Sequence, residues 1–190
     1  NVGGGFAAHR GGAAPDLDGI FARIGQATRA AFGNNPPPLV CEPGRAMVAE
    51  AFQLRLRVKA LSGEAVFLND GIYGGLAEWR DLPAGDRIIA LDTDGALREG
   101  AGRPRIVFGP TCDSLDRLPD PLPLPDSVQE GDYLLFAAMG AYARAIATGF
   151  NGYGARRVVT LAQARLSPQA LDMGVMASNV RLGQQREGAR

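Results

Sequence analysis

The feature that most constrains the fold is a strict alternation of apolar and basic residues from Leu54 to Ala60. An apolar residue occupies every second position, with arginine or lysine between, and this is the period of a half-buried β-strand. Asp94-Gly95 and Glu130-Gly131 are typical turn sequences. Further strand-like apolar runs lie at residues 65–68, 87–91, 105–108, 133–136 and 158–161. The sequence therefore predicts a mainly β domain over residues 52–161.

A different pattern precedes this domain. Residues 1–6 are typical of a strand that runs into a glycine turn, and Asp16 is suited to cap a helix that continues to about Phe32. Residues 39–41 are expected to form a short buried strand, and residues 46–51 a short helix. Two turns that each end a strand, with one helix between them, are typical of a (β/α)8 barrel. The expected fold class is α/β, with the end of such a barrel at residues 1–51 and a β-barrel-like domain after it.

Two segments are predicted to lack regular structure. Residues 118–125 place prolines at every second position, which favours an extended connecting loop and does not match the spacing of a PxxP ligand. Residues 162–190 lose the strand pattern and end in a polar tail, to which we assign no function.

Composition excludes several classes of function. Twenty basic residues balance twenty acidic ones, so nothing favours nucleic acid or an anionic membrane surface. No apolar run approaches the roughly 20 residues that span a bilayer, and the first residues lack the pattern of a signal peptide. The two cysteines suggest no disulfide framework. With His9 as the single histidine, no metal site is evident. We expect a cytoplasmic protein.

Two turns carry residues suited to phosphate. Glycines such as Gly3, Gly4 and Gly5 can present backbone N–H groups to an anion and allow its close approach, although a plain turn explains them equally well. Glu42 adds a carboxylate at a strand end, Gly44 a further backbone N–H group, and Arg45 a cation. The alternative is a helix N-terminus with surface charges.

A third turn, Gly109 to Asp116, places a thiol beside a carboxylate. Cys112 could donate a proton and Asp113 could hold a cationic amine, but a buried structural cysteine beside a capping aspartate is an alternative. Tyr142, just after the strand at 133–136, could donate to a phosphate oxygen or pack in the core.

Taken in order, the motifs VGGGF, CEPGR, LNDGIYG, GPTCDSLD, EGDYLLF, MGAY and FNGY resemble the pyridoxal-phosphate-dependent ornithine decarboxylases. These enzymes belong to the alanine-racemase-like barrel group, together with diaminopimelate and arginine decarboxylases. The resemblance covers roughly residues 1–160, and GPTCDSLD favours the ornithine or lysine/ornithine branch. It implies a lyase of polyamine biosynthesis that converts L-ornithine to putrescine and carbon dioxide.

The resemblance also implies roles for individual residues. Glu42 would pair with the pyridine nitrogen of the cofactor and keep it protonated, which makes the ring a strong electron sink. The residues that would hold the cofactor phosphate are Gly3, Gly4, Gly5, Gly44, Arg45 and Tyr142.

On the substrate side, the resemblance implies that Cys112 protonates the substrate carbon and that Asp113 binds its distal amine. Both would reach into the site of a second subunit, so a homodimer with shared active sites is implied, with Phe150 near its interface. A second substrate carboxylate is expected shortly after the DGIYG turn. Here Glu78 or Asp81 is the candidate.

The lysine that carries the cofactor in this family precedes the glycine run, and this chain begins at that run. Lys59 is the only lysine in the chain and lies on the polar side of a predicted strand. We therefore expect the C-terminal portion of a decarboxylase, inactive as this chain alone. The alternative is a non-catalytic homologue that serves as a binding or regulatory module.

Overall fold

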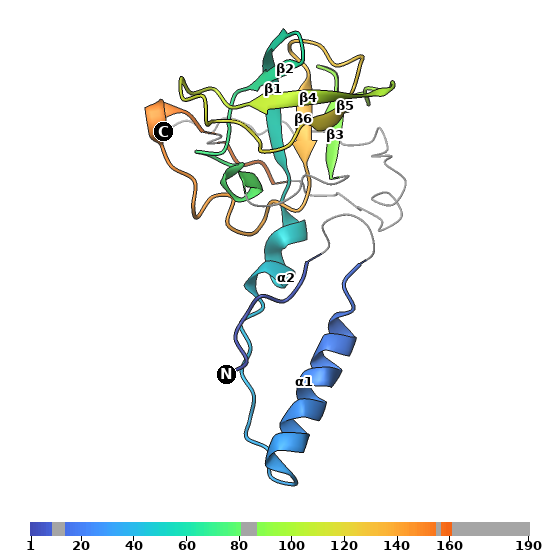
Figure 1. Ribbon diagram of the computed structural model, residues 1–190, viewed down its shortest axis with the longest axis vertical. Helices are drawn as coiled ribbons and strands as arrows, with labels where there is room; N and C mark the ends of the chain where they lie inside the picture. The colour runs from blue at the N-terminus through green and yellow to red at the C-terminus, as the bar shows by residue number, and fades with distance from the viewer. Residues whose placement is uncertain (9–13, 81–86, 155–156, 161–190) are drawn as a thin grey trace, which may run out of the picture.

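The computed structural model describes residues 1–8, 14–80, 87–154 and 157–160. A sheet forms the body of the molecule, α2 lies at its base, and α1 projects away from it (Figure 1). Among the described residues, none of the helices combines the length and the apolar character that a membrane span requires.

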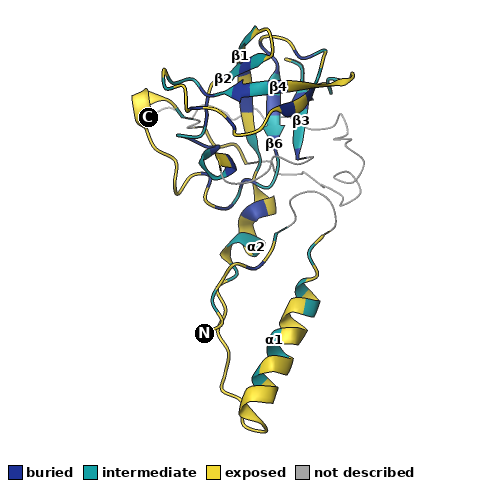
Figure 2. Ribbon diagram, viewed as in Figure 1, coloured by how far each residue is buried: buried dark blue, intermediate teal, exposed yellow. Residues whose placement is uncertain are grey.

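Helix α1 spans Leu17–Phe32, as the sequence predicts. The Asp16 side chain caps it by accepting a hydrogen bond from the Gly19 amide at 2.8 Å. None of its residues is buried (Figure 2), and Phe21 and Phe32 remain exposed. Its apolar face therefore has little packed against it within the described part of the chain.

The predicted strand at 39–41 is not formed. Instead, residues 1–3 and 40–42 lie side by side in the same direction, joined by Val2 N–H to Val40 O and Glu42 N–H to Gly3 O, each at 2.8 Å. Two bonds do not make a regular ladder, which is why the segments stay extended without being strands. Helix α2, Gly44–Val48, continues into the 3₁₀ turn η1, Ala49–Ala51, in place of the predicted helix at 46–51.

Within the described residues, six strands form one mixed sheet in the order β3-β6-β1-β2-β4-β5. The pair β2–β4 is parallel and the other pairs are antiparallel. The strands are β1 Leu54–Ser62, β2 Ala65–Leu68, β3 Ile88–Leu91, β4 Gly102–Phe108, β5 Leu122–Pro125 and β6 Tyr133–Phe136. The strands predicted within 54–60, 65–68, 87–91, 105–108 and 133–136 are confirmed.

Strand β1 pairs with two different strands along its length. Its first half pairs with β6 and its second half with β2, and the register shifts between Val58 and Ala60. The Arg57 amide donates to Asn69 Oδ1 at 2.6 Å beside this irregularity. A register shift of this kind bends a strand, so one long strand can join both halves of the sheet.

The core lies on the inner faces of these strands. The alternation that predicts β1 is borne out, because Leu56 and Val58 are fully buried while Arg55, Arg57 and Lys59 are exposed. The largest other fully buried apolar side chains are Trp79, Phe136, Leu68, Leu76, Leu122, Leu134, Val66 and Val107.

Two predictions at the end of the β region are wrong. Residues 122–125, expected as a loop, form β5 at the edge of the sheet, paired with β4. A proline that cannot donate a ladder hydrogen bond is tolerated on an edge strand, which explains the alternating prolines. Residues 158–160 form no strand. Residue 161 and the tail at 162–190 lie outside the described residues, and the domain boundaries at 51 and 161 stay a prediction.

Candidate functional site

The glycine turn at the N-terminus leaves room for a ligand. Gly3 and Gly5 have φ of +73° and +78°, a region that favours glycine, and a Cβ at either would meet nothing within 4 Å. Gly4 packs closely instead, since a Cβ there would lie 2.6 Å from the carbonyl oxygen of Glu42. The turn is therefore seated on the Glu42 segment and open on its other side.

The Glu42 segment is held by short local bonds. Glu42 Oε1 accepts from the Asn1 side-chain amide at 2.6 Å. The Gly44 amide donates to the Glu42 carbonyl oxygen at 2.9 Å, so it is engaged within the turn, whereas the sequence suggested that it could face a phosphate. A Cβ at Gly44 would meet nothing within 4 Å, and this side of the turn is open as well.

Arg45 and Tyr142 lie together although every strand of the sheet comes between them in the sequence. The Arg45 guanidinium carbon is 4.8 Å from the centre of the Tyr142 ring. Tyr142 is half exposed and has φ of +63°, a rare conformation for a residue with a side chain. Gly140, two residues earlier, donates its N–H to Ala49 O at 2.8 Å, and a Cβ there would overlap the carbonyl oxygen of Val48. This tight seat on α2 and η1 brings the tyrosine to the arginine.

Glu78 also joins this group. It lies on the 3₁₀ turn η2, Ala77–Arg80, and forms an ion pair with Arg45. The resemblance offers Glu78 or Asp81 for substrate; Glu78 contacts a phosphate candidate, and Asp81 lies outside the described residues.

The turn that carries Cys112 is built around Asp116, which is buried. Its carboxylate accepts from Ile72 N–H at 3.0 Å and from Thr111 N–H at 3.1 Å. A Cβ at Gly71 or at Gly109 would overlap this carboxylate. Asp116 therefore links the DGIYG turn (residues 70–74) to the GPTCD turn (residues 109–113) through hydrogen bonds. Both glycines are needed for that close approach.

Asp113 is ordered by a residue of the DGIYG turn. The Tyr73 hydroxyl donates to Asp113 Oδ2 at 2.5 Å, and the Leu115 amide donates to Oδ1 at 2.9 Å. These bonds, the Tyr73 bond foremost, hold the pKa of the Asp113 carboxyl below its usual range. The same bond to Asp113 raises the pKa of the Tyr73 phenol. Asp113 is thus an oriented anion, suited to receive a cation.

Cys112 is exposed, which excludes the buried structural cysteine left open by the sequence. The Asn151 side-chain amide lies 3.6 Å from its Sγ. Asn151 belongs to η3, Phe150–Gly152, and the Phe150 ring packs on Tyr73 with centres 4.8 Å apart. The FNGY segment therefore lies over the Cys112–Asp113 turn.

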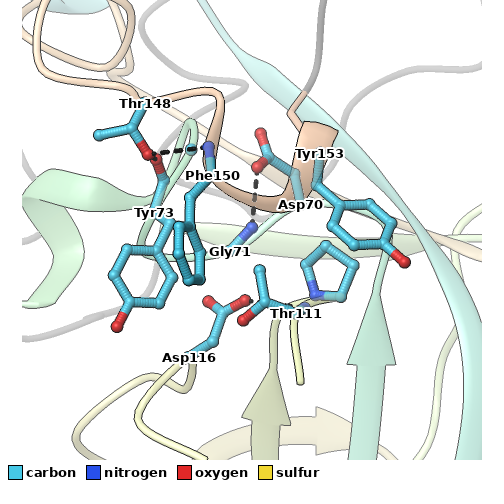
Figure 3. A pocket seen from close by; sticks show the side chains of 10 residues that line it. Asp70, Gly71, Tyr73, Thr111, Asp116, Thr148, Phe150 and Tyr153 are labelled. Carbon is cyan, nitrogen blue, oxygen red and sulfur yellow. Dashed lines mark hydrogen bonds between the residues drawn. The ribbon is translucent and has the colours of Figure 1, made fainter. Parts of the chain in front are cut away.

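A shallow pocket lies at the junction of these turns (Figure 3). The Tyr73 and Phe150 rings lie next to each other at one side, with the Asp116 carboxylate near Thr111 below them. Tyr153 and Thr148 also line the pocket, and the Thr148 hydroxyl donates to Tyr73 O at 2.9 Å. Across the described residues, no group of three or more histidine, cysteine, aspartate or glutamate side chains could hold a metal ion.

The site residues thus fall into two groups. One gathers the glycine turn, Glu42, Arg45, Tyr142 and Glu78, and the other gathers Cys112 and Asp113 with their supports. Sequence reasoning assigned no role to Tyr73 and Asn151. Their motifs drew attention to them, but no spacing rule connects Tyr73 to a residue 40 positions away.

The first group fits a phosphorylated pyridine cofactor. Open space beside Gly3, Gly5 and Gly44 allows the close approach of a phosphate to the backbone. Arg45 supplies a cation, and the Tyr142 ring, which carries a hydroxyl, lies beside its guanidinium. Glu42, two residues before Gly44, offers the carboxylate for a ring nitrogen.

The chain resembles several decarboxylases in sequence. It is 32% identical over 180 residues to an ornithine decarboxylase of Schizosaccharomyces pombe, covering 85% of this chain and 38% of that protein. It is 29% identical over 176 residues to the decarboxylase flvG of Aspergillus flavus, covering 83% of this chain and 39% of that protein.

Solved structures of decarboxylases are similar to it as well. The lysine/ornithine decarboxylase of Vibrio vulnificus complexed with putrescine has a TM-score of 0.64 and 28% identity, covering 80% of this chain and 40% of that one. The lysine decarboxylase of Selenomonas ruminantium has a TM-score of 0.66 and 28% identity, covering 85% and 42%. This chain therefore spans about two fifths of the length of these proteins.

These structures support the expected fold class, the end of a barrel followed by a β-barrel-like domain. Residues 46–140, half of the chain, match the C-terminal sheet domain of the pyridoxal-dependent decarboxylases. The chain therefore belongs to the ornithine, diaminopimelate and arginine decarboxylase family, whose members depend on pyridoxal phosphate.

Proposed function

We propose that this chain forms part of a decarboxylase that acts on a basic L-amino acid, with L-ornithine as the preferred substrate and putrescine and carbon dioxide as products. The observation that carries the proposal is the turn in which the exposed thiol of Cys112 stands next to a carboxylate held by Tyr73. A proton donor beside an oriented anion suits a substrate that needs one proton on carbon and carries a distal ammonium group.

In this proposal, separate residues of the chain bind the cofactor and the substrate. Arg45, Tyr142 and the glycine turn bind the cofactor phosphate, and Glu42 holds a proton at the ring nitrogen. When bound, pyridoxal phosphate supplies the electron sink that accepts the electron pair left as carbon dioxide departs. Cys112 then gives its Sγ proton to the substrate carbon, and Asp113 binds the distal ammonium group and fixes the orientation of the substrate.

The preference for ornithine is supported by the relatives named for it in fungi, plants and animals, at about 30% identity. The structural relatives include enzymes named for lysine, arginine and diaminopimelate. The lysine that carries the cofactor would come from another part of a complete subunit, since the chain spans about two fifths of its relatives.

We further propose a homodimer with shared sites, in which the Cys112–Asp113 turn completes the site of a second copy. Large apolar side chains near this turn are exposed, and exposed apolar patches mark association surfaces. These side chains are Leu115, Phe150 and Tyr153. We propose a cytoplasmic location, since two cysteines in separate motifs suggest no disulfide framework.

The test uses the complete subunit loaded with cofactor. Release of carbon dioxide from carboxyl-labelled L-ornithine, L-lysine and L-arginine is measured, and ornithine is expected to give the highest kcat/KM. Failure to release carbon dioxide from all three would contradict the proposal. Cys112→Ala is expected to lower kcat strongly, whereas Cys41→Ala, which removes the other exposed thiol, is expected to have little effect.

A further inference from the structure

The Arg45 guanidinium is shared by two residues from distant parts of the chain. Glu78 forms an ion pair with its Nη1, and the Tyr142 ring lies beside it. Both charged side chains are largely shielded, with 25% of the Arg45 side chain and 13% of the Glu78 side chain exposed. A partly buried ion pair is screened by salt far less than one on the open surface.

This arrangement creates a conflict of charge at the phosphate site. The proposed function gives Arg45 to a dianionic phosphate, yet a carboxylate of the same sign already contacts the guanidinium. Two anions a few ångströms apart in a shielded site repel each other strongly. The ordering that Glu78 imposes on one arginine side chain is worth less than this repulsion. Phosphate binding is therefore weakened by Glu78 unless the carboxylate moves away.

The turn that carries Glu78 is held in place by the neighbouring residue. Trp79 is buried, packs edge-on against Phe136 with ring centres 5.0 Å apart, and directs its indole Nε1 at Met139 Sδ at 3.0 Å. These contacts anchor η2 to the sheet. A glutamate has three rotatable side-chain bonds, so its carboxylate can swing while the turn stays in place.

We propose that Glu78 and the cofactor phosphate compete for Arg45, so that Glu78 limits cofactor affinity and is released from Arg45 when the phosphate binds. The proposal rests on the proposed function, because it takes Arg45 as a phosphate ligand. It assigns Glu78 to the phosphate end of the site, whereas the sequence offered it for substrate.

The test compares the affinities of the complete, cofactor-free subunit for pyridoxal phosphate and for pyridoxal, which lacks the phosphate, by equilibrium dialysis. E78Q keeps the shape of the side chain and removes its charge. We expect it to bind pyridoxal phosphate at least threefold more tightly and to leave pyridoxal binding unchanged. E50Q, which removes one charge from the exposed Glu50 of the neighbouring η1, is the matched control and should change neither affinity.

An unchanged or weaker affinity of E78Q for pyridoxal phosphate would overturn the proposal, as would an equal gain for pyridoxal. In an Arg45→Ala background the gain should shrink, because Arg45 no longer holds Glu78 beside the phosphate, and a gain of undiminished size there would also overturn the proposal. If E78Q does not fold, E78D, whose carboxylate reaches less far, is expected to bind pyridoxal phosphate more tightly than the unmodified subunit. These affinities are measured without any need for carbon dioxide release. A failure of the Glu78 proposal can therefore be told apart from a failure of the proposed function.

Discussion

The hydroxyl of Tyr73 donates a 2.5 Å hydrogen bond to the carboxylate of Asp113, 40 residues further along the chain. A bond of this length to an ionised acceptor is charge-assisted. It links the DGIYG turn to the turn that carries the candidate proton donor. Asp113 is therefore oriented from a second turn as well as from its own.

Removing this hydroxyl should affect substrate binding more than turnover. We expect Tyr73→Phe to raise KM for ornithine severalfold with a much smaller change in kcat, because Asp113 keeps its charge and loses one of the two hydrogen bonds that orient it. Steady-state kinetics of the complete subunit measure both constants. Tyr153→Phe removes a hydroxyl from the same pocket and is the matched control. A fall in kcat at constant KM would contradict this role for Tyr73.

The same bond predicts a pH dependence of stability. The bond lowers the pKa of Asp113, so the stability that this carboxylate adds to the folded state is present above its unfolded-state pKa of about 3.9 and is lost as pH falls through its folded-state pKa. The bond raises the pKa of Tyr73, so the stability that this phenol adds is fully present below its unfolded-state pKa of about 10 and is lost as pH rises through its folded-state pKa. The difference in Tm between the unmodified protein and Tyr73→Phe should therefore be largest between these limits and shrink beyond both. A difference that stays constant into acid would show that the bond is absent in solution.

Asp116 is predicted to be a structural requirement of the Cys112 turn. In Asp116→Asn one carboxylate oxygen becomes a donor that faces the backbone N–H of Ile72 or Thr111. A buried N–H group left without its acceptor costs about 1–3 kcal/mol. Because both of these hydrogen bonds are partly buried, chemical denaturation should show a loss toward the lower end of this range. Asp120→Asn, at an exposed position four residues away, should change stability little. Equal stabilities of the two variants would contradict the assignment.

Gly140 should tolerate no side chain. In Gly140→Ala the new methyl group would overlap the carbonyl oxygen of Val48, so the backbone must shift, at a cost of about 1–3 kcal/mol. The shift should also draw Tyr142 away from Arg45 and weaken the binding of pyridoxal phosphate, as a titration would show. Gly149→Ala adds the same methyl group where nothing lies within 4 Å and serves as the control. Unchanged cofactor affinity in Gly140→Ala would contradict the claim that the packing of Gly140 positions Tyr142 for cofactor binding.

Most of the sheet could be predicted because its signals are local. Residues 65–68 and 133–136 form strands with the predicted bounds, and the alternation in β1 correctly predicts its buried face. Helix α1 was also predictable, since its cap and its spacing lie within one segment. Strand β5 was missed because prolines argue against a strand unless its position at the edge of the sheet is known.

The candidate site was predictable in its residue types and not in its contacts. The motifs identify Arg45, Tyr142, Cys112 and Asp113, whose roles stay predictions. The ion pair of Arg45 with Glu78 depends on how η2 lies against α2, and no periodicity in the sequence encodes that distance. Such a pair can be predicted only once it is known how the strands that come between the two residues in the sequence pack together.

The close packing of Gly140 against α2 and η1 couples ligand affinity to folding. Arg45 and Tyr142 are separated by every strand of the sheet, so they come together only once the sheet has formed. A ligand held between them binds the folded chain and not the unfolded one, and it shifts the folding equilibrium by mass action. Cofactor concentration would then govern how long the sheet domain survives heat or proteolysis, in addition to whether the site is filled.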